Sequence, residues 1–198
     1  MGFIKKMITI PSVRESLNYD EINQVIINNY SAFTKEYTTF LSEWLTDTNK
    51  IFKDSEKFYI LIYIFNKNLE FFNNNLIEFD YVAFDQTAKF DIQKINIVEI
   101  AKNLNIAKET TRRKILELEN AGVIKRKKKQ ILIDKSSFVL FNVKNTIKSL
   151  TSLVFRIYNI CVQEGIITKK ITRDEIHNLM EKKFSFIMHH YFEFIIPW

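Results

Sequence analysis

Residues that break or cross-link a chain are scarce in this sequence of 198 residues. It contains three glycines, two prolines and one cysteine. An all-β protein needs glycine and proline in its many turns, so their scarcity predicts a mainly helical chain. Because Cys161 has no second cysteine to pair with, an intramolecular disulfide is excluded and the chain suits a reducing compartment.

Long apolar runs and targeting signals are also missing. The longest purely apolar run, residues 58–65, is far shorter than the roughly 20 residues that cross a bilayer. The apolar stretch that follows Lys5 and Lys6 is too short for a signal peptide. We therefore expect no membrane association and a cytoplasmic protein.

Groups that could perform catalysis are few. The sequence has three histidines and one cysteine, and it has no glycine-rich phosphate loop, paired-cysteine spacing or nucleophile motif. His189 and His190 are adjacent, so we expect them to point to different helix faces, and His177 lies three turns away. These features predict that the protein is not an enzyme and that it has no metal site or cofactor.

The net charge of +6 is concentrated in one window. Residues 108–129 hold nine basic and three acidic residues, so they carry the whole excess of positive charge, and the rest of the chain is neutral. A basic patch on a neutral body is typical of proteins that bind nucleic-acid phosphates. A merely solvated charge run is the alternative, but the patch coincides with a structural motif.

That motif begins at Asn96, which precedes a segment of helical periodicity. Glu99 follows three residues later, which is the capping-box pattern of a helix start. The spacing predicts a short helix over 97–103, a turn at 105–107 and a second helix from 108 that Gly122 closes in the left-handed conformation. On the second helix we expect three residues to pack against the first, namely Thr111, Ile115 and Leu118.

A β-hairpin is predicted directly after the second helix. Two short runs rich in β-branched residues, 123–126 and 130–133, flank a basic tip. Helix, turn, helix and hairpin together form a winged helix-turn-helix.

These residues resemble the DNA-binding segment of cyclic-AMP-receptor-type and MarR-type bacterial regulators. The resemblance covers about 40 residues and is carried by Ile100–Ala101, Ala107–Ile115 and Leu118–Ile124. In the cyclic-AMP-receptor-type family the second helix opens with Arg-Glu-x-x-x-Arg, and those side chains contact base edges. The resemblance assigns these roles to Lys108, Glu109 and Arg113.

Two positions depart from the family pattern. Lys108 replaces the first Arg and lacks its planar fork, which weakens discrimination at guanine. Ala107 stands at the usual Ser or Thr cap position, a deficit on the order of 1 kcal/mol. No segment resembles the family's cyclic-nucleotide-binding barrel, so the resemblance does not imply that ligand.

Helical segments are predicted on both sides of the motif. Apolar spacing indicates one continuous helix from Asp20 to Leu45, a second from Ser55 to Phe72 and a less regular stretch from 76 to 94. After the hairpin, a long helix is expected over 138–163, with one apolar side formed by Val143, Ile147, Leu150, Val154, Ile157 and Cys161. Thr172 and Glu175 form another capping box, which starts a final helix that reaches about Phe194.

The predicted fold is mainly α, a winged helix-turn-helix with a small hairpin wing between long terminal helices. The three regions are an N-terminal dimerisation region at 1–54, the DNA-binding domain at 55–137, and a C-terminal dimerisation or effector region at 138–198. The aromatic C-terminus, 184–192, is interpreted as core or interface. A monomer is the alternative to the expected homodimer.

The predicted function is sequence-specific transcriptional regulation through double-stranded DNA. Helix 108–121 would read the major groove, and wing 125–129 would contact flanking phosphates. A plasmid-type replication initiator and a winged-helix protein-interaction module remain alternatives, and any small-molecule effector is left open. The residues expected to contact DNA are Lys108, Glu109, Thr110, Arg112, Arg113, Lys125, Arg126, Lys127, Lys128 and Lys129.

Overall fold

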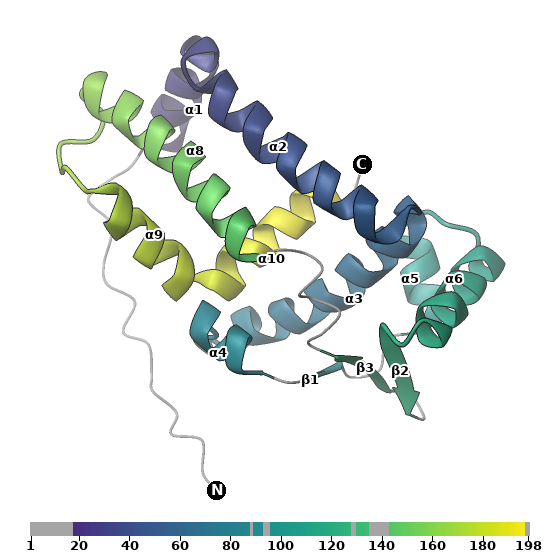
Figure 1. Ribbon diagram of the computed structural model, residues 1–198. Helices are drawn as coiled ribbons and strands as arrows, with labels where there is room; N and C mark the ends of the chain where they lie inside the picture. Colours follow the sequence, from purple (N-terminus) through teal and green to yellow (C-terminus); the bar gives the residue numbers. More distant parts are fainter. Residues whose placement is uncertain (1–17, 88, 93–95, 128–129, 135–142, 197–198) are drawn as a thin grey trace, which may run out of the picture. The chain divides into compact units, whose positions relative to one another are not determined.

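The computed structural model describes residues 18–87, 89–92, 96–127, 130–134 and 143–196, and these are mainly helical, as predicted (Figure 1). Contacts divide the chain into two units, which we describe separately. Of the described residues, the helical unit comprises 18–44 and 144–181, and the winged unit comprises those between 45 and 143 and 182–196. The three functional regions proposed from the sequence stay a prediction.

Helix α3 (Ser55–Asn74) is the centre of the winged unit. Asp54 is the N-cap of α3, because the Asp54 carboxylate accepts a hydrogen bond from the Lys57 N–H at 3.2 Å. Its middle is buried nearly all round, from Ile60 to Asn66, which confirms the predicted helix at 55–72. A helix that is apolar on most sides must be covered on most sides. Accordingly, α5, α6, α10 and β1 all contact α3.

The helix-turn-helix consists of α5 (Ile97–Asn103) and α6 (Lys108–Asn120), and both bounds agree with the prediction. Gly122 closes the motif at φ +74°, in the left-handed region that the sequence predicted. The hairpin is also confirmed, with β2 (Ile124–Lys127) antiparallel to β3 (Gln130–Asp134) and Ile124 opposite Ile133.

Two elements lie in the stretch predicted to be irregular. Helix α4 (Tyr81–Gln86) starts at Asp80, whose carboxylate accepts from the Ala83 N–H at 2.7 Å. Strand β1 (Lys89–Ile92) pairs with β3, which gives a three-stranded antiparallel sheet in the order β1-β3-β2. Four residues are too few to show a strand's alternation, so only pairing with β3 defines β1.

The helical unit holds α1 (Tyr19–Asn28), most of α2 (Tyr30–Phe52), α8 (Val143–Gln163) and nearly all of α9 (Arg173–Lys182). The prediction of one continuous helix from Asp20 to Leu45 is wrong. Asn29 interrupts it at φ −111° and ψ 20°, and the Asn29 side-chain amide donates to the Val25 carbonyl at 3.0 Å. Short amide side chains compete with the helix for backbone groups in this way.

Helix α8 begins at Val143, and residues 138–142 of the predicted helix lie outside the described residues. Ile147 and Cys161 of the predicted apolar side are buried, but so are Thr151, Leu153 and Ile160, which the prediction did not include. No helix in the described part of the chain is long and apolar enough to span a membrane.

The predicted final helix is also two helices. The capping box is confirmed, since the Thr172 N–H donates to the Glu175 carboxylate at 2.7 Å and the Glu175 N–H to the Thr172 hydroxyl at 3.2 Å. However, α9 ends at Lys182, and α10 (Phe184–Ile195) follows after Lys183. Helix α10 packs on α3, with the rings of Phe192 and Phe65 6.0 Å apart. The aromatic C-terminus therefore contributes to the core of the winged unit.

Candidate nucleic-acid interface

The turn between α5 and α6 fixes the second helix. Asn105 lies in the left-handed region at φ +51°, which asparagine tolerates better than most residues, and the Ile106 N–H donates to the Ala101 carbonyl at 3.0 Å. On α6, Thr111, Ile115 and Leu118 are all buried, and α6 contacts α5. The predicted buried face of the second helix is therefore confirmed.

The start of α5 differs in part from the predicted capping box. Asn96 caps the helix as expected, because its side-chain oxygen accepts from the Val98 N–H at 2.9 Å. The Glu99 carboxylate accepts from the Tyr63 hydroxyl at 3.0 Å instead of returning to Asn96. Burial and the nearby Glu99 carboxylate raise the pKa of Tyr63, so its hydroxyl keeps its proton and serves as the donor. This bond joins α5 to α3.

The N-terminus of α6 has no side-chain cap. Ala107 precedes the helix with an extended ψ of 135° and forms no side-chain hydrogen bond, as its methyl group dictates. The first N–H groups of an α-helix have no partner within the helix, and they lie at the positive end of its dipole. Without a serine or threonine at position 107, these groups are open to an external acceptor such as a phosphate oxygen.

The first two turns of α6 present a charged, solvent-exposed face. Lys108, Glu109, Arg112 and Arg113 are exposed, and Thr110 beside them is half-buried. The Arg112 guanidinium holds Glu109 in a two-pronged contact, with Nε 2.9 Å and 3.0 Å from the two carboxylate oxygens. The hydrogen bond with Arg112 lowers the pKa of Glu109, so Glu109 is ionised at neutral pH.

Glu109 is joined to Arg112 and not to Arg113, the arginine that the resemblance assigns to base contact. Arg113 Nε lies 3.9 Å from Glu117 Oε1, a loose contact on a side chain that is 63% exposed. Arg113 is consequently the less constrained of the two arginines. The α6 face thus offers one arginine with a fixed orientation and one that can adjust.

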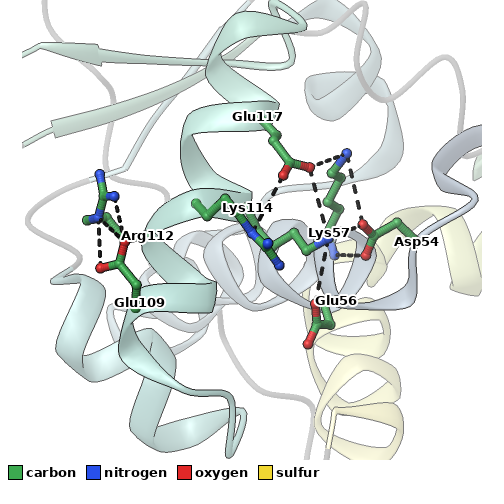
Figure 2. A network of polar contacts seen from close by, with 8 residues as sticks. Asp54, Glu56, Lys57, Glu109, Arg112, Lys114 and Glu117 are labelled. Carbon is green, nitrogen blue, oxygen red and sulfur yellow. Dashed lines mark hydrogen bonds and ion pairs between the residues drawn. The ribbon is translucent and has the colours of Figure 1, made fainter.

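Lys114, on the same helix, reaches α3 and belongs to a different group of charges (Figure 2). Its Nζ lies 2.5 Å from Asp54 Oδ2, and its side chain is only 12% exposed. Alongside it, Lys57 Nζ lies 2.6 Å from Glu117 Oε2. We call Asp54, Lys57, Lys114 and Glu117 the α3–α6 ion cluster. Lys114 therefore neutralises carboxylates of the protein itself, although its charge counts toward the basic window.

The wing is tied to α6 by a similar contact. Arg126 on β2 donates from Nε to Glu119 Oε2 at 2.7 Å, and the Arg126 backbone N–H donates to the same carboxylate at 3.4 Å. Lys125 beside it is exposed. The side chain of Lys127 and the whole of Lys128 and Lys129 lie outside the described residues, so their predicted DNA contacts stay a prediction.

The three acidic residues of the basic window share one structural task. Glu109 holds Arg112, Glu117 holds Lys57, and Glu119 holds Arg126. Each contact fixes a cation on or beside α6. From the sequence, Glu117 and Glu119 counted only as charges subtracted from the patch, whereas Glu109 was expected to contact DNA. The i,i+3 spacing of Glu109 and Arg112 could have revealed their pairing.

Comparison with known protein families agrees with this description. Residues 91–133 match the model of the DeoR-like helix-turn-helix domain, a match of about a fifth of the chain that includes α5, α6 and β2. No curated protein and no solved structure was found to match the chain. The chain thus carries a DeoR-like helix-turn-helix DNA-binding domain of the kind found in bacterial transcription regulators. The cyclic-AMP-receptor-type and MarR-type resemblance is not part of this finding.

Proposed function

We propose that this protein is a sequence-specific transcription regulator that inserts the first two turns of α6 into the major groove. The observation that carries the proposal is the exposed face of Lys108, Glu109, Arg112 and Arg113 directly after an uncapped helix start. Arginine donates to guanine O6 and N7, and glutamate accepts from cytosine N4. A helix with both side-chain types on its first turns can therefore distinguish base pairs.

The residues of this face have different roles in the proposal. Arg113, which is loosely held, reads a base. The preformed Glu109–Arg112 pair offers an acceptor and a donor in a fixed geometry, which suits readout of one base step or of a base and a neighbouring phosphate. Lys108 contacts a guanine or a phosphate near the helix start.

The wing supplies affinity more than specificity. Lys125, Arg126 and the three lysines at 127–129 follow α6 in the chain, and β2 contacts α6. Cations at this place suit the phosphates that flank the major-groove site. Arg126 has an additional role, since its contact with Glu119 sets the position of the wing. Such a protein acts where the chromosome lies, which supports a cytoplasmic location in a bacterium.

Selection of bound DNA from a random library tests this proposal. The full chain should enrich one sequence, and its affinity for that site should exceed its affinity for random DNA by a factor of about 10³ or more. An enriched two-fold symmetric site would support the dimer described next. Equal affinity for selected and random DNA at physiological salt would contradict the proposal, because binding would then rest on phosphates alone.

We further propose a homodimer formed by the helical unit, because symmetric dimers match two-fold DNA sites. Tyr19, Ile27 and Tyr30 are large side chains exposed to solvent on α1 and at the start of α2, whereas Phe33 and Phe40 are buried. Replacing Ile27 by Glu should shift the protein from dimer to monomer in sedimentation velocity at micromolar concentration. The exposed Lys144→Glu on α8 serves as a charge-change control. Wild-type protein that sediments as a monomer would refute the dimer.

A further inference from the structure

Three potential metal ligands meet on the surface of α10. The Glu193 carboxylate lies between two imidazoles, with Oε1 3.5 Å from His189 Nε2 and Oε2 3.1 Å from His190 Nδ1. One ligand atom from each of the three residues lies within 4.8 Å of the others. The sequence suggested that the two histidines point to different helix faces, yet their ring centroids are only 5.2 Å apart.

The spacing of these atoms suits one small metal ion. Two ligand atoms at about 2.1 Å from a tetrahedral Zn²⁺ are roughly 3.4 Å from each other. The two contacts of Glu193, one through each carboxylate oxygen, are both close to that value. Imidazole and carboxylate are ligands that Zn²⁺ and its neighbours in the first transition series accept.

A partner on a second helix orients His189. Its Nδ1 lies 2.9 Å from the side-chain oxygen of Asn66 on α3, and both residues are buried. When Nδ1–H donates to this oxygen, the lone pair of Nε2 faces Glu193. An imidazole whose far nitrogen donates to an oxygen, while its near nitrogen faces the ion, is the usual arrangement at protein metal sites.

This arrangement leaves two acceptors opposed. The Nε2 lone pair and the Glu193 oxygen both accept, so they need a proton or a cation between them. A divalent cation placed between these two atoms can accept a lone pair from each of them.

The site is open to solvent on one side. The side chains of His190 and Glu193 are each 54% exposed, whereas that of His189 is 11% exposed. An ion can therefore enter from solvent, and water can complete its coordination. The buried ligand and its Asn66 partner would supply rigidity, and the exposed pair would supply access.

We propose that His189, His190 and Glu193 bind one divalent transition-metal ion of the Zn²⁺ class, with Asn66 orienting His189. The proposal does not depend on DNA binding. Since Asn66 belongs to α3, the ion stabilises the packing of α10 on the central helix of the winged unit. Metal bound only by the folded chain raises its thermal stability.

Titration of the untagged full chain, first stripped with a chelator, tests the site. Co²⁺ should give visible absorption that saturates at one ion per chain, and Zn²⁺ should displace it. His190→Ala and Glu193→Gln should each weaken binding at least about tenfold, and added Zn²⁺ should raise the midpoint of thermal unfolding more in the wild type than in either of these variants. Both positions are exposed, so circular dichroism should show these variants folded.

The matched control is His177→Ala. His177 Nε2 lies 3.5 Å from Glu181 Oε1 with the same i,i+4 spacing, but within the described residues no third histidine, cysteine or acidic ligand joins this pair. Its removal should leave the Co²⁺ titration unchanged. The proposal is wrong if the stripped wild type shows no saturable Co²⁺ or Zn²⁺ binding. It is equally wrong if His177→Ala weakens binding as much as the other variants, or if both of those variants bind like wild type.

Discussion

The α3–α6 ion cluster leads to a prediction about what Lys114 does for DNA binding. Replacing Lys114 by Met keeps most of the side-chain length and removes the charge that faces Asp54. The Lys114 side chain is 12% exposed and that of Asp54 20%, so solvent screens their 2.5 Å contact less than a surface ion pair. A hydrogen bond between charged groups contributes about 1.5–3 kcal/mol to stability.

The expected cost lies at or just below the lower end of that range. Asp54 keeps the Lys57 N–H at 3.2 Å and the Lys57 ammonium at 3.9 Å, so its charge is not left alone. We therefore expect Lys114→Met to lower the free energy of unfolding by about 1–2 kcal/mol. For a chain of this size, that corresponds to a decrease of about 2–8 °C in the unfolding midpoint.

A double-mutant cycle with Asp54→Asn isolates the pair. Asparagine keeps an oxygen that can cap α3, so this substitution removes mainly the charge. If the two side chains stabilise the protein by interacting with each other, the loss of unfolding free energy in the double variant should be about 1 kcal/mol smaller than the sum of the losses in the two single variants. Urea unfolding of the four proteins at one salt concentration measures this coupling.

DNA binding separates a structural role of Lys114 from a phosphate contact. Each phosphate contact steepens the log–log dependence of affinity on salt by about 0.9. Lys114→Met should leave this slope unchanged and reduce the ratio of specific to random affinity, because α6 loses its hold on α3. Lys125→Met is the matched control, since this lysine is exposed on the wing. The Lys125→Met substitution should lower the salt slope and leave the unfolding midpoint unchanged. Our reasoning fails if Lys114→Met lowers the slope by about 0.9 while the unfolding midpoint stays at the wild-type value.

Three further predictions concern base readout, the wing and acid stability. Arg113→Ala should cost about 1–3 kcal/mol on the selected site and little on random DNA in a fluorescence binding assay, and equal losses would mean that Arg113 touches only phosphate. Serine at all three of residues 127–129 should weaken binding to every sequence and lower the salt slope by several units in a dimer, whereas an unchanged slope would remove the wing from the interface. Burial raises the pKa of Asp54, but the hydrogen bonds from Lys114 and from the Lys57 N–H outweigh it and hold that pKa below its ordinary value. The stabilisation from Asp54 is therefore present at neutral pH and lost as the pH falls below about 4, so the urea midpoints of wild type and Asp54→Asn should converge on acidification.

The helix-turn-helix and its wing could be predicted from local sequence patterns. The bounds of α5 and α6, the left-handed Gly122 and the hairpin all follow from patterns within a few residues. Helical periodicity, an asparagine cap and a glycine stop act locally, so a single sequence contains their full signal. The exposed charged face of α6 follows from the same periodicity.

The breaks in the long helices and the pairing of β1 became visible only in the folded structure. The spacing of apolar residues continues through Asn29 and Lys183, so periodicity gives no sign of either interruption. A four-residue strand such as β1 is stable only beside β3, about 40 residues further along the chain. Such pairing depends on the fold as a whole.

The contacts between residues far apart in the chain could not be predicted from the sequence either. Lys114 meets Asp54 across 60 positions, and His189 meets Asn66 across 123. From the sequence alone, each of these side chains would be interpreted as an ordinary polar residue on a helix. The role of each side chain depends on which helix packs against the helix that carries it. That packing results from many weak apolar contacts spread over the whole core.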